Sequence, residues 1–295
     1  MALSNSRNAT DSLHSNGPKV GLLLVNHGSR SKVWRQTLVS LETRVRDSVL
    51  EGNIIEEVKT AFMEYTEPSI ATRMKEFDRE GFTDVIVLPI FLTISSHSDD
   101  DIPTILGQKS DAERITALKN ENIECYTPAA QPHITPLLDF SQTLPKNVLR
   151  RCRELSVQPE NEGLVLIGYG DEEYETKWRE LFDEVAMKVN EAIGISEYSY
   201  GWCGHIVRYD RNETTKAVNK VLTAKDTAIV IPVLVAYSKM FQKNIIGRGI
   251  KEVKEYEERV LYKADSILPD IDIEEWVINI SAEYANKITL KEQPA

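Results

Sequence analysis

Three side chains in the first half of the sequence have types and positions that suit metal binding. His27, Glu64 and His97 each stand at or just after the end of a short apolar run. Ligands bind in open α/β sheets beyond the carboxyl ends of the strands, so we expect these side chains at one sheet edge. Two histidines and one carboxylate leave coordination positions open on a metal ion. All three are therefore catalytic candidates, with His27 and His97 as the metal ligands.

The elements that must position these residues alternate between strand and helix. Continuous apolar runs predict strands buried on both faces, and apolar residues at helical spacing predict helices between them. The expected order is strand 20–25, helix 33–50, strand 58–63, helix 68–80, strand 85–92 and a helix after Asp101. We expect Pro68 in the first turn of its helix, where its missing N–H costs nothing. This alternation predicts a parallel, doubly wound α/β sheet.

The second half of the sequence repeats the first. VGLLLVNHGSR is answered by GLVLIGYGDE, and VIVLPIFLTISSHSDDDI by AIVIPVLVAYSKMFQKNI, at residues 20–30, 163–172, 85–102 and 228–245. Pro132-His133-Ile134 and Pro269-Asp270-Ile271 extend the match to the closing segments at nearly the same offset. The sequence therefore predicts two similar doubly wound parallel-sheet lobes that face a central cleft.

The boundaries of these lobes follow from composition. Residues 1–17 are polar, rich in Ser and Asn, and lack the apolar stretch of a secretory signal, so we expect a disordered tail. We place an N-terminal lobe carrying the metal site at residues 18–157. A degenerate C-terminal copy occupies residues 158–295, with a linker around residues 158–162.

The two copies differ at the candidate site. Tyr169 stands where the first copy has His27, Met240 stands where it has His97, and the counterpart of Glu64 falls near Ile206. A loop histidine on its own is most often a hydrogen-bonded surface or capping group. Residues that a fold requires should recur in both copies, so this asymmetry favours a single functional site in the first lobe.

Several neighbouring residues have ordinary structural explanations. We expect Glu67 to serve as a charge at a helix N-terminus and Asp99–Asp101 to cap a helix, although these aspartates could also guide cations. His133 resembles a helix-start residue with a capping role. Trp34 and Tyr65 could pack on a macrocycle, but core packing is the usual fate of such aromatic residues.

The motifs around the candidate residues resemble those of one family. H-G-S-R at residues 27–30, A-F-x-E-x-x-E-P-S-I from Ala61, and V-L-P-I-F-L followed by His97 are similar to the CbiX/sirohydrochlorin chelatases, the class II tetrapyrrole metal chelatases. The resemblance is strong over about residues 18–150 and weak beyond them. It suggests a two-lobed long form of the family with a degenerate second half.

This resemblance implies a function and roles for residues. The resemblance implies a lyase that inserts a divalent metal ion into sirohydrochlorin during cobalamin or siroheme (porphyrin) biosynthesis. The metal ion is Co²⁺ or Fe²⁺, with Ni²⁺ as a further alternative, and we favour a cobaltochelatase. The family's metal-binding histidines match His27 and His97, and its neighbouring acidic residue matches Glu64. No cofactor is expected beyond the substrate metal ion.

Sirohydrochlorin carries many carboxylates, which basic residues could bind. Arg30, Lys32 and Arg35 flank the first site loop, and Lys239 and Lys243 flank its counterpart in the second lobe. His205 could face the cleft from the second lobe and touch substrate or metal. Solvated surface charge is the alternative explanation for the basic residues.

Composition excludes several classes of protein. The 295 residues carry a formal net charge of −11, which argues against a nucleic-acid-binding face. No apolar run approaches the roughly 20 residues that span a bilayer. Three cysteines without a C-x-x-C pair support neither a disulfide framework nor a metal cluster, so we expect a cytoplasmic protein. One chain supplies both lobes, so a monomer is the simplest expectation.

Two other functions fit the same residues. A carrier that binds a metal or a tetrapyrrole without catalysis needs the same ligands. A zinc-assisted hydrolase could also use two histidines and a glutamate, but the sequence lacks a nucleophile elbow and an H-E-x-x-H helix.

Overall fold

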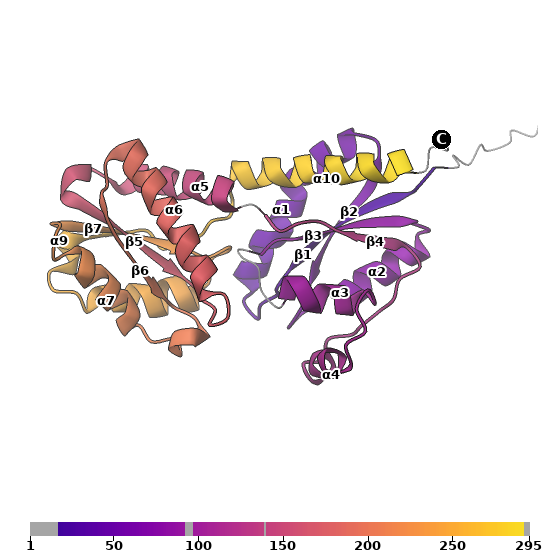
Figure 1. Ribbon diagram of the computed structural model, residues 1–295, viewed down its shortest axis with the longest axis horizontal. Coiled ribbons are helices and arrows are strands. Elements are labelled where there is room, and N and C mark those ends of the chain that lie inside the picture. The colour runs from indigo at the N-terminus through magenta and orange to yellow at the C-terminus, as the bar shows by residue number, and fades with distance from the viewer. Residues whose placement is uncertain (1–16, 92–96, 139, 292–295) are drawn as a thin grey trace, which may run out of the picture.

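The computed structural model describes residues 17–91, 97–138 and 140–291, with the backbone alone at residues 97, 98, 140, 141 and 291. It contains two parallel four-stranded sheets, ordered β2-β1-β3-β4 and β6-β5-β7-β8 (Figure 1). The strands are β1 (Val20–Asn26), β2 (Ile55–Phe62), β3 (Asp84–Pro89), β4 (Gln131–Ile134), β5 (Glu162–Gly168), β6 (Glu197–Trp202), β7 (Thr227–Val233) and β8 (Val260–Tyr262). The predicted pair of doubly wound α/β lobes is confirmed.

Helices cover both faces of each sheet. They are α1 (Lys32–Glu51), α2 (Ile70–Arg79), α3 (Ile102–Ile105), α4 (Ala112–Asn120), α5 (Phe140–Leu155), α6 (Glu175–Ile193), α7 (Asn212–Val221), α8 (Gly247–Lys251), α9 (Tyr256–Arg259) and α10 (Ile271–Lys291). Two π-helical segments, η1 (His97–Asp101) and η4 (Lys239–Ile246), and a 3₁₀ turn, η3 (His205–Val207), follow strands of the two sheets. None of the helices in the described ranges is long and apolar enough to cross a membrane.

Strand register places the candidate residues at one edge of the first sheet. The central strand β1 is buried along its whole length, as a strand covered by helices on both faces requires. Asn26 pairs with Phe62 on one side, and Val25 pairs with Pro89 on the other. The carboxyl ends of β1, β2 and β3 therefore lie level with one another.

Helix α2 starts later than the sequence suggests. The N-cap is Ser69, whose hydroxyl accepts a hydrogen bond from the Thr72 N–H, and the Glu67 carboxylate accepts one from the Ser69 N–H at 2.6 Å. Pro68 precedes the cap, so its predicted place in the first helical turn is wrong. The two side-chain acceptors satisfy N–H groups at the start of the helix, which agrees with the expected place of the Glu67 charge at a helix N-terminus.

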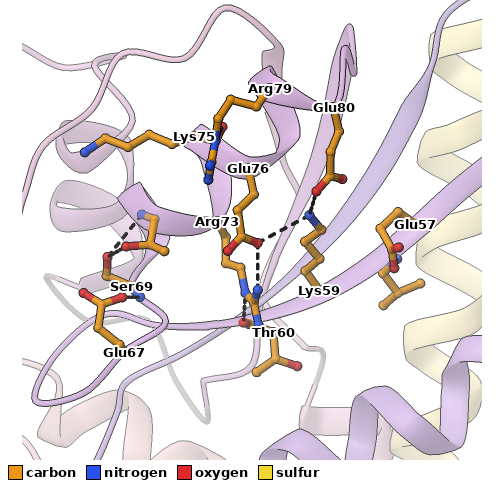
Figure 2. A network of polar contacts seen from close by, with 12 residues as sticks. Glu57, Lys59, Thr60, Glu67, Ser69, Arg73, Lys75, Glu76, Arg79 and Glu80 are labelled. Carbon is orange, nitrogen blue, oxygen red and sulfur yellow. Dashed lines mark hydrogen bonds and ion pairs between the residues drawn. The ribbon is translucent and has the colours of Figure 1, made fainter.

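A partly buried ion-pair network fastens α2 to the edge strand β2 (Figure 2). The Lys59 ammonium lies 2.6 Å from a carboxylate oxygen of Glu80 and 3.4 Å from one of Glu76. Arg73 reaches Glu76 and also donates to the Thr60 carbonyl. Burial favours a raised pKa for Glu76, but hydrogen bonds and charge from Arg73 and Lys59 outweigh it and hold the pKa below its usual value. The network steadies the turn after β2, which carries Glu64.

The predicted duplication holds for the first three strands of each lobe but not for the closing segment. Residues 132–134 belong to β4, which pairs with β3, whereas residues 269–271 lie beyond β8 at the start of α10. The true counterpart of β4 is β8, which pairs with β7. The connection that carries α4 has no equally long equivalent in the second lobe, so a constant offset fails there.

The two lobes exchange their closing helices. Helix α5 leaves the first sheet and packs on α6 and β7, while α10 leaves the second sheet and packs on α1 and β3 (Figure 1). One continuous apolar cluster consequently contains residues of both lobes, including Leu24, Val148 and Val277. A division at residue 157 follows the strands of the two sheets but not these two helices.

Asp270 organises the point where the exchanged helices cross. Its carboxylate accepts hydrogen bonds from the backbone N–H groups of Asp272 and Ile273, which begin α10, and from the Asn147 side chain of α5 at 2.8 Å. It also pairs with Arg150, which reaches Asp272 at 2.5 Å. One buried carboxylate thus caps α10 and joins it to α5.

We predict that Asp270→Ala lowers the free energy of unfolding by about 2–4 kcal/mol, because it removes a helix cap and leaves buried donors unpaired. Glu283→Ala is the control on the same helix, since Glu283 is half exposed and pairs with the exposed Lys287. We expect that control to cost less than about 0.5 kcal/mol. Urea unfolding of both variants measures the difference, and equal costs would contradict the assigned role of Asp270.

Candidate active site

The turns after β1 and β2 come into direct contact. Gly28 has φ +106°, and a Cβ atom there would lie 2.0 Å from the Glu64 carbonyl oxygen. The Glu64 N–H donates to the His27 carbonyl at 2.8 Å. Because only glycine fits this backbone conformation and this close approach, the H-G pair holds His27 beside Glu64.

The side chains of His27 and Glu64 meet. The His27 Nε2 atom lies 3.8 Å from Oε1 of Glu64, and the two side chains are 35% and 12% exposed. A metal ion with bonds of about 2.1 Å to each ligand fits within this separation. The pair can therefore share one ion, and either group can accept a proton.

The predicted third member follows strand β3. His97 begins the π-helical segment η1 beyond β3, but its side chain lies outside the described residues. Among the side chains that the structure describes, no cluster of three His, Cys, Asp or Glu residues could hold a metal ion. A shared ion between His27 and His97 thus stays a prediction.

Tyr65 extends the site, contrary to the expected core packing. Its side chain is exposed, and its ring centre lies 6.1 Å from that of His27 and 5.6 Å from the Arg30 guanidinium. A hydrogen bond with Glu64, together with burial and the Glu64 charge, raises the pKa of Tyr65 to about 12. Trp34 packs against the apolar core as expected. The sequence signal for Tyr65 was its position directly after Glu64.

The candidate basic residues differ in their surroundings. Arg30 and Lys32 are exposed beside the first site loop, whereas Arg35 donates to the Ser29 carbonyl at 2.6 Å and steadies that loop. Lys239 and Lys243 are exposed on η4, in the second lobe. Lys243 also borders a cavity of about 460 Å³ lined in part by Tyr256 and Tyr262.

The acidic run beyond β3 is held by ion pairs. Asp100 lies 2.8 Å from Lys109, and Asp101 lies 2.5 Å from Arg114. Asp101 occupies the N-cap position of α3 without a capping hydrogen bond, so the expected capping role is wrong there. Arginine supplied from α4 gives this buried carboxylate a stronger partner than the helix N–H groups.

His133 has a structural role other than the expected one. It lies in β4, and its Nε2 atom is 2.7 Å from Asp84 at the start of β3. The predicted helix-capping role is wrong, because the segment pairs as a strand. This hydrogen-bonded contact ties the edge strand to its neighbour at the end of the sheet remote from His27.

The second lobe repeats the backbone of the site. The Gly204 N–H donates to the Tyr169 carbonyl at 2.9 Å, as the Glu64 N–H does to His27. Strand register agrees, since Gly168 pairs with Trp202. Gly204 is therefore the counterpart of Glu64. The predicted position near Ile206 is wrong because the connection from β5 to β6 is shorter than the one from β1 to β2: Asn26 pairs with Phe62, whereas Gly168 pairs with Trp202.

Because Gly204 corresponds to Glu64, the next residue, His205, corresponds to Tyr65. The rings of Tyr169 and His205 lie 5.5 Å apart, and the His205 Nδ1 atom is 3.4 Å from the Tyr169 hydroxyl. Each lobe thus carries one histidine–tyrosine contact at its carboxyl edge, with the two residue types exchanged between the strands. Sequence comparison at constant offset hid this exchange.

Known proteins resemble the chain in both sequence and fold. The CbiX family model matches residues 21–155. The sirohydrochlorin cobaltochelatase of Methanocaldococcus jannaschii is 37% identical over 86 residues, which are 29% of this chain and 57% of that relative. The corresponding enzyme of Methanococcoides burtonii is 32% identical over 35% of this chain and 77% of its own length.

A solved structure extends the likeness to both lobes. SirB from Bacillus subtilis with Fe³⁺ superposes with a TM-score of 0.67 at 20% identity, over 90% of this chain and 96% of that one. The chain spans little more than half the length of several curated relatives that it matches, including the first. The match to most of the Methanococcoides enzyme, together with the family model, shows that this chain is a member of the CbiX family.

Proposed function

We propose that this protein inserts a divalent metal ion, with Co²⁺ as its main substrate, into sirohydrochlorin. The observation that carries the proposal is the His27–Glu64 contact at the carboxyl edge of the first sheet. That contact lies in the segment matched by the CbiX model, and several relatives of the same segment are named sirohydrochlorin cobaltochelatase. Bacillus subtilis sirohydrochlorin ferrochelatase is 25% identical over 54% of this chain, so Fe²⁺ is the second candidate metal.

Metal insertion needs a loosely held ion and an acceptor for protons. In our proposal His27 and His97 bind the substrate ion and leave positions open for the ring nitrogens, which then replace the protein ligands stepwise. Two pyrrole N–H protons must leave as the ion enters. Glu64, 3.8 Å from His27, is placed to accept one of them.

The substrate carboxylates need positive charge at the rim of the site. Arg30 and Lys32 supply it beside His27, and Lys239 and Lys243 supply it from the second lobe. Arg35 acts indirectly by holding the Ser29 carbonyl. Guanidinium and ammonium groups at the rim can thus bind a polyanionic ring despite the net charge of −11.

We further propose a monomeric cytoplasmic enzyme without a resident cofactor and without nucleic-acid or membrane partners. One chain supplies both lobes, and the exchanged helices join them through one apolar cluster. Cys125, Cys152 and Cys203 are free thiols, which suits a reducing compartment. Burial raises the pKa of Cys203 to about 12, so this thiol stays protonated.

We predict that His27→Ala abolishes turnover with sirohydrochlorin and Co²⁺ and weakens Co²⁺ binding at least 10-fold, because it removes a metal ligand. Absorbance of the macrocycle measures turnover, and calorimetry measures the binding of Co²⁺ alone. The matched control is His133→Gln, which keeps a donor toward Asp84 far from the site. Stoichiometric binding of sirohydrochlorin by the unmodified protein, with no metallated product, would contradict the enzyme and indicate a carrier.

We predict that Glu64→Gln lowers kcat by about 10²–10⁴-fold, because the amide keeps the shape of the side chain but cannot accept a proton. Steady-state kinetics with Co²⁺ and with Fe²⁺ measure the loss. Glu67→Gln, three residues further along the chain, is the control and should keep kcat within about 3-fold, because the Glu67 carboxylate accepts a hydrogen bond at the start of α2. Equal losses in the two variants would refute a special role for Glu64.

We predict that Arg30→Ala raises the KM for sirohydrochlorin about 10-fold with little change in kcat, since a rim charge contributes uniform substrate binding. Lys254→Ala removes a charge that is 87% exposed and pairs with Glu255 elsewhere on the second lobe. That control should leave KM unchanged. A loss in kcat alone for Arg30→Ala would instead tie Arg30 to the chemical step.

A further inference from the structure

The second lobe presents an imidazole at the edge that corresponds to the site. His205 is exposed and begins η3, directly after the turn that corresponds to Glu64 in the first lobe. Its ring contacts Tyr169, the counterpart of His27. The second lobe thus has tyrosine and glycine where the site has its first histidine and its carboxylate, and it carries an imidazole at the adjacent position.

Electrostatic interactions connect this edge with the first lobe. An electrostatic interaction with Tyr65 is one of the smaller causes that raise the pKa of Tyr169, and interactions with Asp99 and Asp100 help to raise the pKa of Tyr174. Such electrostatic effects require the groups to lie near one another. The Tyr169–His205 pair therefore lies near the part of the first lobe that carries Tyr65.

Packing fixes the partner of His205. The Tyr169 ring packs edge-on against Phe241 at 5.6 Å, and its phenol forms a hydrogen bond with Tyr209. Burial is the main cause, and this hydrogen bond the second, that holds the pKa of Tyr169 well above its usual range, so the phenol stays protonated. When Nδ1 of His205 donates its hydrogen to the Tyr169 oxygen, Nε2 keeps its lone pair for another proton.

We infer that His205 is a catalytic base of the second lobe, which accepts a pyrrole proton on the face of the macrocycle opposite the His27–Glu64 site. The inference rests on the proposed function. The pyrrole N–H bond breaks, its electron pair stays on nitrogen and forms the bond to the metal ion, and the proton passes to Nε2 of His205. Water then removes that proton, so the imidazole returns to its neutral form.

Opposite faces suit the two tasks. The metal ion approaches from the face on which its ligands lie. Once Glu64 has accepted one proton there, the positive charge of the ion opposes the loss of the second proton on the same side. A base on the other face accepts the second proton without competing for the ion. Glu64 and His205 thereby divide the two protons of one insertion.

His205→Ala tests this inference in the full chain with sirohydrochlorin and Co²⁺. We expect kcat to fall about 10²-fold, while KM for sirohydrochlorin and the affinity for Co²⁺ alone stay within about 3-fold. Free imidazole at millimolar concentration should restore part of kcat in His205→Ala and none in His205→Leu, where the larger side chain fills the space. His133→Gln, a histidine variant remote from both edges, should keep full activity.

The outcomes of the His205→Ala experiment separate this inference from the proposed function. A His205→Ala variant with unchanged kcat, in a protein whose turnover His27→Ala abolishes, would overturn this inference and leave the proposed function intact. A lower kcat that imidazole does not restore, or a matching loss of Co²⁺ affinity, would also overturn it by indicating a structural or ligand role. Absence of turnover in the unmodified protein would overturn the proposed function and this inference together.

Discussion

The close approach of two turns at the edge of the first sheet determines the rest of the site. Gly28 lets the chain turn with φ +106° directly against the Glu64 backbone, where any side chain would collide with a carbonyl oxygen. The hydrogen bond between Glu64 and His27 then sets their side chains 3.8 Å apart. Parallel strands, level at their carboxyl ends, supply the two turns. An imidazole–carboxylate pair thus follows from backbone geometry.

The second lobe keeps this backbone and changes its chemistry. Gly170 also has positive φ, and the Gly204–Tyr169 hydrogen bond repeats the one beneath His27. A Cβ atom at Gly204 would lie 2.4 Å from the Tyr169 carbonyl oxygen. A carboxylate therefore cannot return at residue 204 without movement of the backbone. The turn instead carries a contact between Tyr169 and His205, so the imidazole stands one residue after the position that corresponds to Glu64.

Sequence reasoning worked where a single element carries the signal. Apolar runs predicted the buried strands β1, β3, β5 and β7, and helical spacing predicted α1 to within about a residue at each end. Strand ends then gave His27 and Glu64, because ligands collect at that edge of a parallel sheet. These predictions needed no knowledge of tertiary contacts.

The errors have a common physical origin in tertiary contacts. A longer connection through α4 breaks the constant offset of the repeat, so residues 269–271 were matched to a strand that they do not form. The register of the turn after β6, which only pairing with β5 defines, decided between Gly204 and Ile206. The exchange of α5 and α10 likewise leaves no trace in periodicity, because either sheet offers an equivalent apolar face.

Duplication gives this family member a freedom that two identical lobes lack. Identical edges would set the same ligands on both sides of a bound ring, and a metal ion would then find equal sites on its two faces. Here one edge carries His27 and Glu64, and the other carries Tyr169 and His205. In the proposed reaction the ion moves in one direction and the protons leave in others, so unlike edges match the asymmetry of the chemistry. The exchanged helices hold the unlike edges in one molecule, because one apolar cluster runs through both lobes.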